Sequence, residues 1–156
     1  MRLLKSADLP LNNELPEFTA FLRGYGHPNI RATHTSTVEF TTQRHLTSKG
    51  DCIVVVAADI GAAGLPQPLK NSLRNPGSTA VFELTCEGER DTLTARGHSL
   101  LTLDDPVSMV VRKSRYTSPR TVAVDSDKAA RDLSRTLVRK LASGAEATVR
   151  ITVSTP

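Results

Sequence analysis

Residues 30–42 of this 156-residue chain read IRATHTSTVEFTT, and their side chains alternate in character along the run. Val38 and Phe40 fall on the same face as Ile30, whereas threonines and Glu39 occupy the positions between them. A period of two in β-branched and apolar residues predicts a half-buried β-strand. The next apolar run, CIVVVAA at 52–58, is continuous and therefore predicts a strand that is covered on both faces.

Five further segments have the character of strands, which makes seven in all. They are 79–87, 91–100, 107–113, 120–126 and 146–153. We expect one long helix at 127–144, capped by Asp125 or Ser126 and ended by Gly144, and shorter helices at 65–75 and 14–26.

Because these helices do not alternate with the strands, the pattern predicts an α+β, mainly antiparallel β fold. About seven strands would form a barrel or a sandwich, with one long C-terminal helix and one or two short helices. Residues 1–25 are expected to be a partly helical N-terminal extension, and residues 26–156 a single β-rich domain. We find no internal repeat in the sequence.

Composition narrows the functional classes. The chain has no Trp and only two cysteines, Cys52 and Cys86, which are too few for a secreted disulfide framework or a four-cysteine zinc site. The N-terminal residues contain no signal-peptide core and no membrane-spanning run. We therefore expect a soluble cytoplasmic protein without a metal site, and the sequence indicates neither a cofactor nor an oligomeric state.

The positive charge is concentrated in the last third of the chain. Residues 101–156 contain ten Lys and Arg against six acidic residues, whereas the preceding 100 residues are balanced, so this third supplies the whole net charge of +4. Within it, 109–121 reads MVVRKSRYTSPRT, with cations, hydroxyls and no acid. Guanidinium and hydroxyl groups together are typical of phosphate recognition, although a solubilising loop has the same composition.

The predicted ligand-binding residues combine this loop with cations of the expected long helix. They are Arg112, Lys113, Ser114, Arg115, Arg120, Thr121, Lys128 and Arg135. Strand geometry favours Arg112 and Arg120, on the strands that flank the loop, as the residues that hold an anion. The sequence thus predicts a module that binds a phosphate-bearing ligand, either RNA or a nucleotide.

An enzyme acting on an anionic small molecule is the alternative, and a structural or assembly subunit is a third possibility. The candidate catalytic residues are His34, Asp51, Cys52, Asp59 and His98. A histidine can activate a thiol while a carboxylate orients the histidine, although Cys52 at the start of an apolar run is also typical of a small buried hydrophobic residue.

Three long blocks resemble an archaeal family known as domain of unknown function 371. They are GHPNIRATHTSTVEFT at 26–41, LTSKGDCIVVVAADIGAAGLP at 46–66 and SMVVRKSRYTSPRTVAVDSDKAARDL at 108–133. The resemblance covers roughly residues 26 to 153. It implies a compact, mainly β domain of the archaeal cytoplasm, and it implies no particular activity.

Overall fold

The computed structural model describes residues 16–156, which form eight strands in two four-stranded sheets. The first sheet is antiparallel and has the order β1 (Glu17–Tyr25), β8 (Glu146–Ser154), β4 (Thr79–Cys86) and β5 (Glu89–Arg96). The second has the order β3 (Ile53–Val55), β2 (Thr37–Thr41), β6 (Ser108–Arg112) and β7 (Thr121–Ala123). Its central pair is antiparallel, and its outer pairs are parallel.

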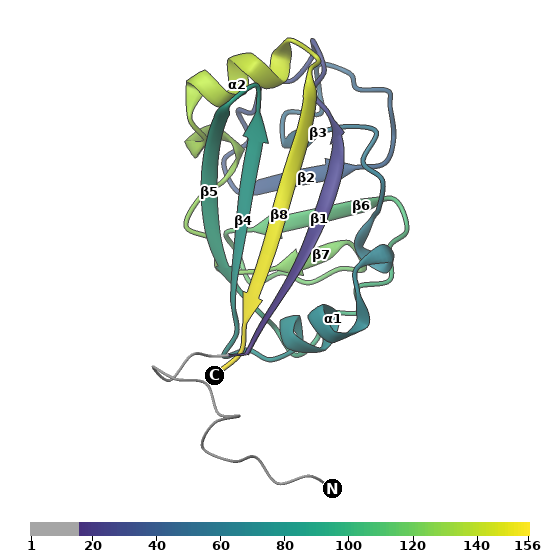
Figure 1. Ribbon diagram of the computed structural model, residues 1–156, viewed down its shortest axis with the longest axis vertical. Coiled ribbons are helices and arrows are strands. Elements are labelled where there is room, and N and C mark those ends of the chain that lie inside the picture. Colours follow the sequence, from purple (N-terminus) through teal and green to yellow (C-terminus); the bar gives the residue numbers. More distant parts are fainter. Residues whose placement is uncertain (1–15) are drawn as a thin grey trace, which may run out of the picture.

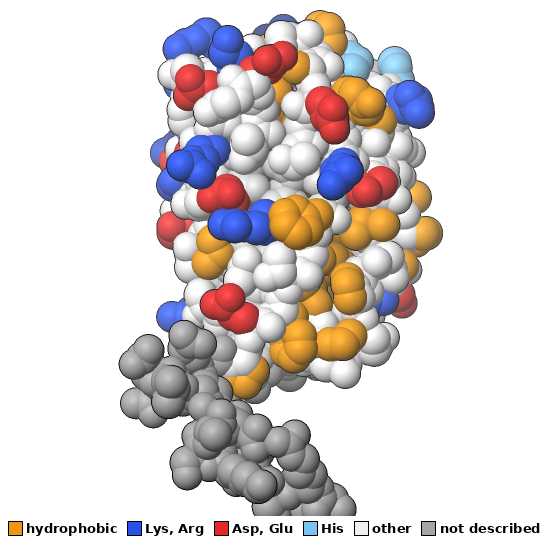
Figure 2. All heavy atoms as spheres, in the orientation of Figure 1, with side chains coloured by type: hydrophobic (Ala, Val, Ile, Leu, Met, Phe, Trp, Pro, Cys, Tyr) orange, Lys and Arg blue, Asp and Glu red, His pale blue; other side chains and the backbone are white. Residues whose placement is uncertain are grey.

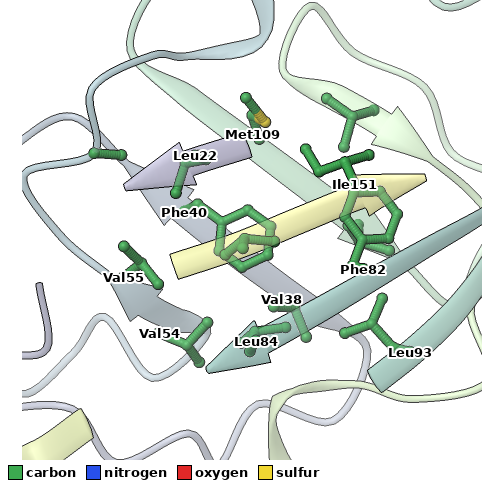
Figure 3. Close-up of a cluster of buried hydrophobic side chains, with 14 of the residues drawn as sticks. Leu22, Val38, Phe40, Val54, Val55, Phe82, Leu84, Leu93, Met109 and Ile151 are labelled. Carbon is green, nitrogen blue, oxygen red and sulfur yellow. The ribbon is translucent and has the colours of Figure 1, made fainter. Parts of the chain in front are cut away.

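The strands of the two sheets cross at a steep angle, and the core lies between them (Figure 1). Two short helices, α1 (Gln67–Leu73) and α2 (Arg135–Ala142), lie at opposite ends of the molecule. The core is mainly aliphatic, and within residues 16–156 its only aromatic pair joins Phe40 of β2 to Phe82 of β4, with ring centroids 6.4 Å apart (Figure 3). No helix within residues 16–156 is both long and apolar enough to span a membrane.

Residues 16–156 consist of two units that have the same fold. The order β1, β2, β3, α1, β4 recurs as β5, β6, β7, α2, β8, and each helix is preceded by a single 3₁₀ turn. At the end of β1, Tyr25 exchanges two main-chain hydrogen bonds with Val56; at the end of β5, Arg96 exchanges the same two with Val124. The repeat was not found from the sequence, because the two units share geometry more than residue identity.

The matched turns make the repeat unambiguous. His27 and His98 each use Nδ1 to accept the amide of the residue two positions later, 3.0 Å away in both units. Ala32 and Leu103 then both adopt a positive φ, at 51° and 54°. Positive φ is rare for residues other than glycine. Its recurrence at matched positions therefore indicates one backbone design used twice.

The two units are related by an approximate two-fold axis. Antiparallel pairing of β2 with β6 sets Glu39 opposite Val110, and pairing of β4 with β8 sets Glu83 opposite Arg150. Each of these pairs joins two equivalent positions of the units, so both lie on the axis. The axis thus emerges at Glu39 and Val110 on the second sheet, and at an ion pair of 3.5 Å between Arg150 and Glu83 on the first.

The predicted fold class was wrong. Eight strands form two separate sheets, neither of which closes into a barrel, and parallel pairs accompany the antiparallel ones. The long helix expected at 127–144 is absent, because the α-helix has only eight residues and begins after its N-cap, Ser134. Before it, Asp127 and Asp132 accept main-chain amides with their carboxylates, which favours turns over a helix.

The helix expected at 14–26 is also wrong in its described part, where residues 17–25 form β1. Ala20, Leu22 and Gly24 point inward at a period of two, and β8 pairs with the whole strand. Gly24 is required by a close approach rather than by a helix end, because a Cβ atom there would lie 2.5 Å from the carbonyl oxygen of Val56. Residues 1–15 of the expected extension lie outside the described residues.

Substitution of two equivalent aspartates tests whether the matched turns of the two units contribute equally to stability. Asp59 Oδ1 accepts the amide of Arg23 at 3.0 Å, and Asp127 Oδ1 accepts the amide of Thr94 at 2.9 Å. We expect Asp59→Ala and Asp127→Ala each to lower the free energy of unfolding by about 1 kcal/mol, because each removes one equivalent hydrogen bond.

Urea denaturation measures both losses. Asp104→Ala is the control, because within residues 16–156 the Asp104 side chain accepts only the nearby Thr102 hydroxyl, so that we expect a loss within about 0.5 kcal/mol. Unequal losses at Asp59 and Asp127 would contradict the equivalence of the two turns.

Candidate functional site

The candidate site surrounds Glu39, where the two-fold axis leaves the second sheet. Val38 and Phe40 point into the core, so Glu39 points to the outer face, yet only 7% of the residue is exposed. Its Oε1 lies 3.5 Å from an Arg120 guanidinium nitrogen and 3.6 Å from Cys52 Sγ. A nearly buried carboxylate is thus held between a cation and a thiol.

Cys52 and Arg120 occupy equivalent positions in the two units. The carbonyl of Cys52 accepts the amide of Glu39 at 2.9 Å, and the carbonyl of Arg120 accepts the amide of Val110 at 2.7 Å. The parallel pairings of β3 with β2 and of β7 with β6 place both residues beside the axis. Their side chains therefore converge on Glu39 from opposite sides.

Arg112 adds a second guanidinium to this face. It ends β6 opposite Thr37, donates from Nε to Thr121 Oγ1 at 2.8 Å and donates to Ser118 Oγ at 3.2 Å. Its Cζ lies 4.9 Å from the centroid of the Tyr116 ring. Burial, and then the charge of Arg120, lower the pKa of Arg112, which shows that the two cations share one electrostatic environment.

We call Glu39, Cys52, Arg112 and Arg120 the axial cluster. The equivalents of Thr37 and Arg112 across the axis are Ser108 and Thr41, two buried residues whose hydroxyls lie 3.4 Å apart. Ser108 and Thr41 thus form a neutral, hydrogen-bonded pair on one side of the axis, whereas Arg112 lies opposite Thr37 on the other. The charged groups of the axial cluster are positions at which the two units have diverged.

His34 contacts Thr37, which lies opposite Arg112 in the pairing of β2 with β6. Its Nδ1 lies 3.0 Å from the Thr37 hydroxyl and accepts the amides of Ser36 and Thr37 at 3.2 and 3.1 Å. Burial and the charge of Glu39 raise the pKa of Cys52, and the Thr37 hydroxyl lowers it. The imidazole Nδ1 therefore orders a turn, in the place where Asp105 accepts two amides in the second unit.

Asp51, Asp59 and His98 have other contacts and do not complete a catalytic set with His34 and Cys52. Asp51 contributes its main-chain carbonyl to the amides of Thr33 and His34. Asp59 binds the amide of Arg23, and His98 accepts the amide of Leu100. Within the described residues, His34 therefore contacts Thr37 rather than Cys52, and no histidine, thiol and carboxylate triad is assembled.

Several cations of the predicted basic loop have acidic partners. Lys113 pairs with Asp132 at 3.4 Å, and Arg115 pairs with Asp125. Ser114 Oγ accepts the amide of Tyr116 within the loop. The loop sequence itself contains no acidic residue, but in the folded structure aspartates of the segment that follows β7 pair with its cations.

The remaining predicted cations stabilise the second unit. Lys128 pairs with Asp91 at 2.7 Å and also donates to the carbonyl of Thr92. Arg135 donates to main-chain carbonyls, including that of Ala32 at 3.1 Å. Both side chains are thus engaged within the domain.

Glu39 was not predicted as a member of a site, and the predicted ligand-binding residues leave out Tyr116 and Ser118, although both lie in the basic loop. The alternation in residues 30–42 does place Glu39 on the outer face of its strand, where it is the only carboxylate among threonines. A single carboxylate on an otherwise neutral face of the strand was the feature of the sequence that could have indicated a site at Glu39. Its contact with Arg120 could not be read from a sequence separation of 81 residues.

The thiol of Cys52 is in its protonated form at neutral pH. Burial first, and then the charge of Glu39, raise the pKa of Cys52 to about 11. Cys86 is buried, and both cysteines are free thiols. Within residues 16–156, no group of three or more His, Cys, Asp or Glu side chains is arranged to hold a metal ion.

Comparison with known proteins places this architecture in a family. The model of the domain of unknown function 371 matches residues 22–154, which include every described strand except the first five residues of β1. A protein of Methanocaldococcus jannaschii whose name reads "Uncharacterized protein" is 38% identical over 132 residues, which cover 85% of this chain and 97% of that relative.

The environment of Cys52 leads to a prediction about its reactivity. With a pKa of about 11, only about one thiol in a thousand is ionised at pH 8, so we expect alkylation by iodoacetamide to be slow and to accelerate up to about pH 11. Glu39→Gln removes a charge that raises this pKa and should speed alkylation at pH 8 several-fold.

Peptide mass spectrometry of a time course measures alkylation at Cys52 and Cys86 separately. Glu83→Gln, at the other end of the axis, is the matched control and should leave the rate at Cys52 unchanged. Rapid alkylation of the wild-type Cys52 at pH 7 would contradict the protonated state of the thiol.

Proposed function

The chain belongs to the family of domain of unknown function 371, and we propose that it binds a small phosphate-bearing ligand, such as a nucleotide, at the axial cluster. The observation that carries the proposal is the pair of guanidiniums, Arg112 and Arg120, around the single carboxylate of Glu39. Two cations against one anion leave one uncompensated positive charge on this face. An incoming phosphate would supply the missing negative charge.

The two arginines are suited to different parts of that task. Arg112 is fixed by Thr121 and Ser118, so its orientation is set before a ligand arrives. Arg120 is held more loosely, with one nitrogen 3.5 Å from Glu39 and 48% of its side chain exposed. A guanidinium has five N–H donors, so both arginines retain donors for phosphate oxygens.

Tyr116 supports a nucleotide as the phosphate-bearing ligand. Its ring packs against Arg112 and is 63% exposed. An exposed aromatic ring beside a guanidinium offers a surface on which a base can stack. A base on Tyr116 would leave the attached phosphate next to Arg112 and Arg120.

The local charge balance favours a small ligand over a long RNA. Lys113, Arg115 and Lys128 are each paired with an aspartate, so among the four cations of the basic loop the uncompensated charge lies at Arg112 and Arg120. Extended RNA binding relies on many unpaired cations along a groove. The described cations of this region do not form such a row.

Binding is also better supported than thiol catalysis. A thiol whose pKa is about 11 is a poor nucleophile at neutral pH, and His34 contacts Thr37 rather than Cys52. The proposal places the protein in a reducing cytoplasm, which the free thiols of Cys52 and Cys86 support.

Calorimetry with pyrophosphate, AMP and ATP in low salt tests the proposal. We expect millimolar or tighter binding that weakens as salt rises, because phosphate contacts are electrostatic. Arg120→Ala should weaken binding at least tenfold, since a hydrogen bond to a charged group contributes about 1.5–3 kcal/mol.

The control is Arg115→Ala, which removes one cation of the same loop but one already paired with Asp125. Its affinity should stay within about twofold of the wild type. The proposal is wrong if none of the three ligands binds, or if Arg115→Ala and Arg120→Ala lose affinity equally. Tighter binding of a twelve-nucleotide RNA than of ATP would instead favour an RNA-binding surface.

A further inference from the structure

The free edge of β1 presents main-chain groups that no described residue binds. β1 is the outer strand of its sheet, and among the described strands it pairs only with β8. The Pro16 carbonyl bonds to Thr155 on the β8 side, whereas Tyr25 bonds to Val56 on the other side. Because successive strand residues alternate in direction, Thr19 and Phe21 direct their N–H and C=O groups away from β8, as Tyr25 does.

Part of this edge is already covered. Asp59 accepts the Arg23 amide with its carboxylate, and its own amide donates to the Arg23 carbonyl. Among residues 16–156, no equivalent contact covers Thr19 or Phe21. The open portion is therefore the first half of the strand.

The second unit shows how the same edge can be closed. There, Lys128 Nζ donates to the carbonyl of Thr92 at 2.8 Å, and the Asp91 carboxylate accepts the amide of Thr92. Lys128 and Asp91 also pair with each other at 2.7 Å. A charged pair beside an outer strand protects its edge from pairing with another chain.

The first unit lacks this protection. The equivalents of Asp91, Thr92 and Lys128 are Ala20, Phe21 and Ile60, none of which carries a charge. Phe21 is 58% exposed and Tyr25 49% exposed on the same outer face of β1. Hydrophobic side chains gather over the lower part of β1 and over α1 in Figure 2, so the open edge adjoins an apolar surface.

We propose that β1 pairs with β1 of a second copy of this chain, so that two first sheets join into one continuous antiparallel sheet. A two-fold arrangement centred on Ala20 sets Thr19 opposite Phe21 of the other copy, and these are the residues with free main-chain groups. Asp59 covers the main chain of Arg23, so the paired ladder ends before that residue. Beyond the ladder, the same arrangement directs the Glu17 side chain of each copy towards the Arg23 side chain of the other. The strand is thus complementary in charge to itself when antiparallel.

This self-complementarity is what identifies the partner. A peptide of unrelated sequence would satisfy the main-chain groups equally, but the opposite charges at the two ends of β1 match a reversed copy of β1. Within the described residues, neither Glu17 nor Arg23 forms an ion pair. The pairing would thus give both charges a partner.

Sedimentation velocity over protein concentrations of about 1–500 µM tests the proposal on the full chain. The wild type should change from monomer to dimer across this range. Phe21→Thr installs the residue found at the equivalent place in β5 and should shift the equilibrium to the monomer. Thr19→Pro should do the same, because the amide it removes points away from β8.

Leu100→Thr is the matched control, because Leu100 is 68% exposed but lies in the second unit. It should leave the dimer unchanged. The proposal is overturned if the wild type stays monomeric at the highest concentration. It is equally overturned if the dimer persists in both Phe21→Thr and Thr19→Pro.

A charge exchange tests the register. Glu17→Arg places like charges opposite each other twice and should weaken the dimer roughly tenfold, whereas Glu17→Arg combined with Arg23→Glu should restore it. Failure of the double variant to recover would overturn the pairing centred on Ala20. Glu17 and Arg23 lie on the first sheet, and the axial cluster lies on the second, so ligand binding and dimer formation can fail independently.

Discussion

The pairing of β2 with β6 is the contact on which the remaining structure depends. It joins the two units at their axis and sets Glu39 opposite Val110, so it decides which side chains meet on the outer face of the second sheet. Without this pairing, Cys52 and Arg120 would belong to separate halves and would not share Glu39. Because a nearly buried carboxylate is costly unless it has a partner, Glu39 in turn requires Arg120. The scaffold and the candidate site therefore have one physical origin.

Comparison of the two units separates residues that build the fold from residues that serve another purpose. Asp59 and Asp127 form the same hydrogen bond in both units, so their chemistry is explained by folding alone. Arg112 and Arg120, by contrast, stand where the first unit has Thr41 and Cys52, although the backbone is the same. Arg120 balances the charge of Glu39, but Arg112 remains a cation that the backbone does not need, and ligand binding provides an explanation for it. Phe21 of β1 and Thr92 of β5 also occupy equivalent positions with different side chains, at the two edges of the first sheet.

Strands with clear periodicity could be predicted from the sequence, and contacts between distant segments could not. The alternation around Val38 and Phe40 marked β2, although the strand is shorter than the alternating run because Ala32 turns with a positive φ. The helix expected before residue 26 failed because β8, more than a hundred residues away, pairs with that segment. The basic loop was found, but its acids come from Asp125 and Asp132, beyond the following strand. Arg112 and Arg120 could be chosen from strand geometry, whereas Glu39 acquires its role only through the pairing of the two units.

Duplication also explains why the two proposed surfaces do not compete. The axis leaves the molecule once through each sheet, at Glu39 on the second sheet and at the Glu83 and Arg150 pair on the first. Divergence at the Glu39 end produced a charged cluster, and there the parallel strands β3 and β7 cover both outer edges of the central pair. The first sheet ends instead in β1 and β5, two equivalent edges of which only β5 carries a charged pair. Because β5 is protected and the first half of β1 is open, one edge of the first sheet remains available for pairing with another chain. Pairing through that single edge would give a closed dimer rather than a growing fibre.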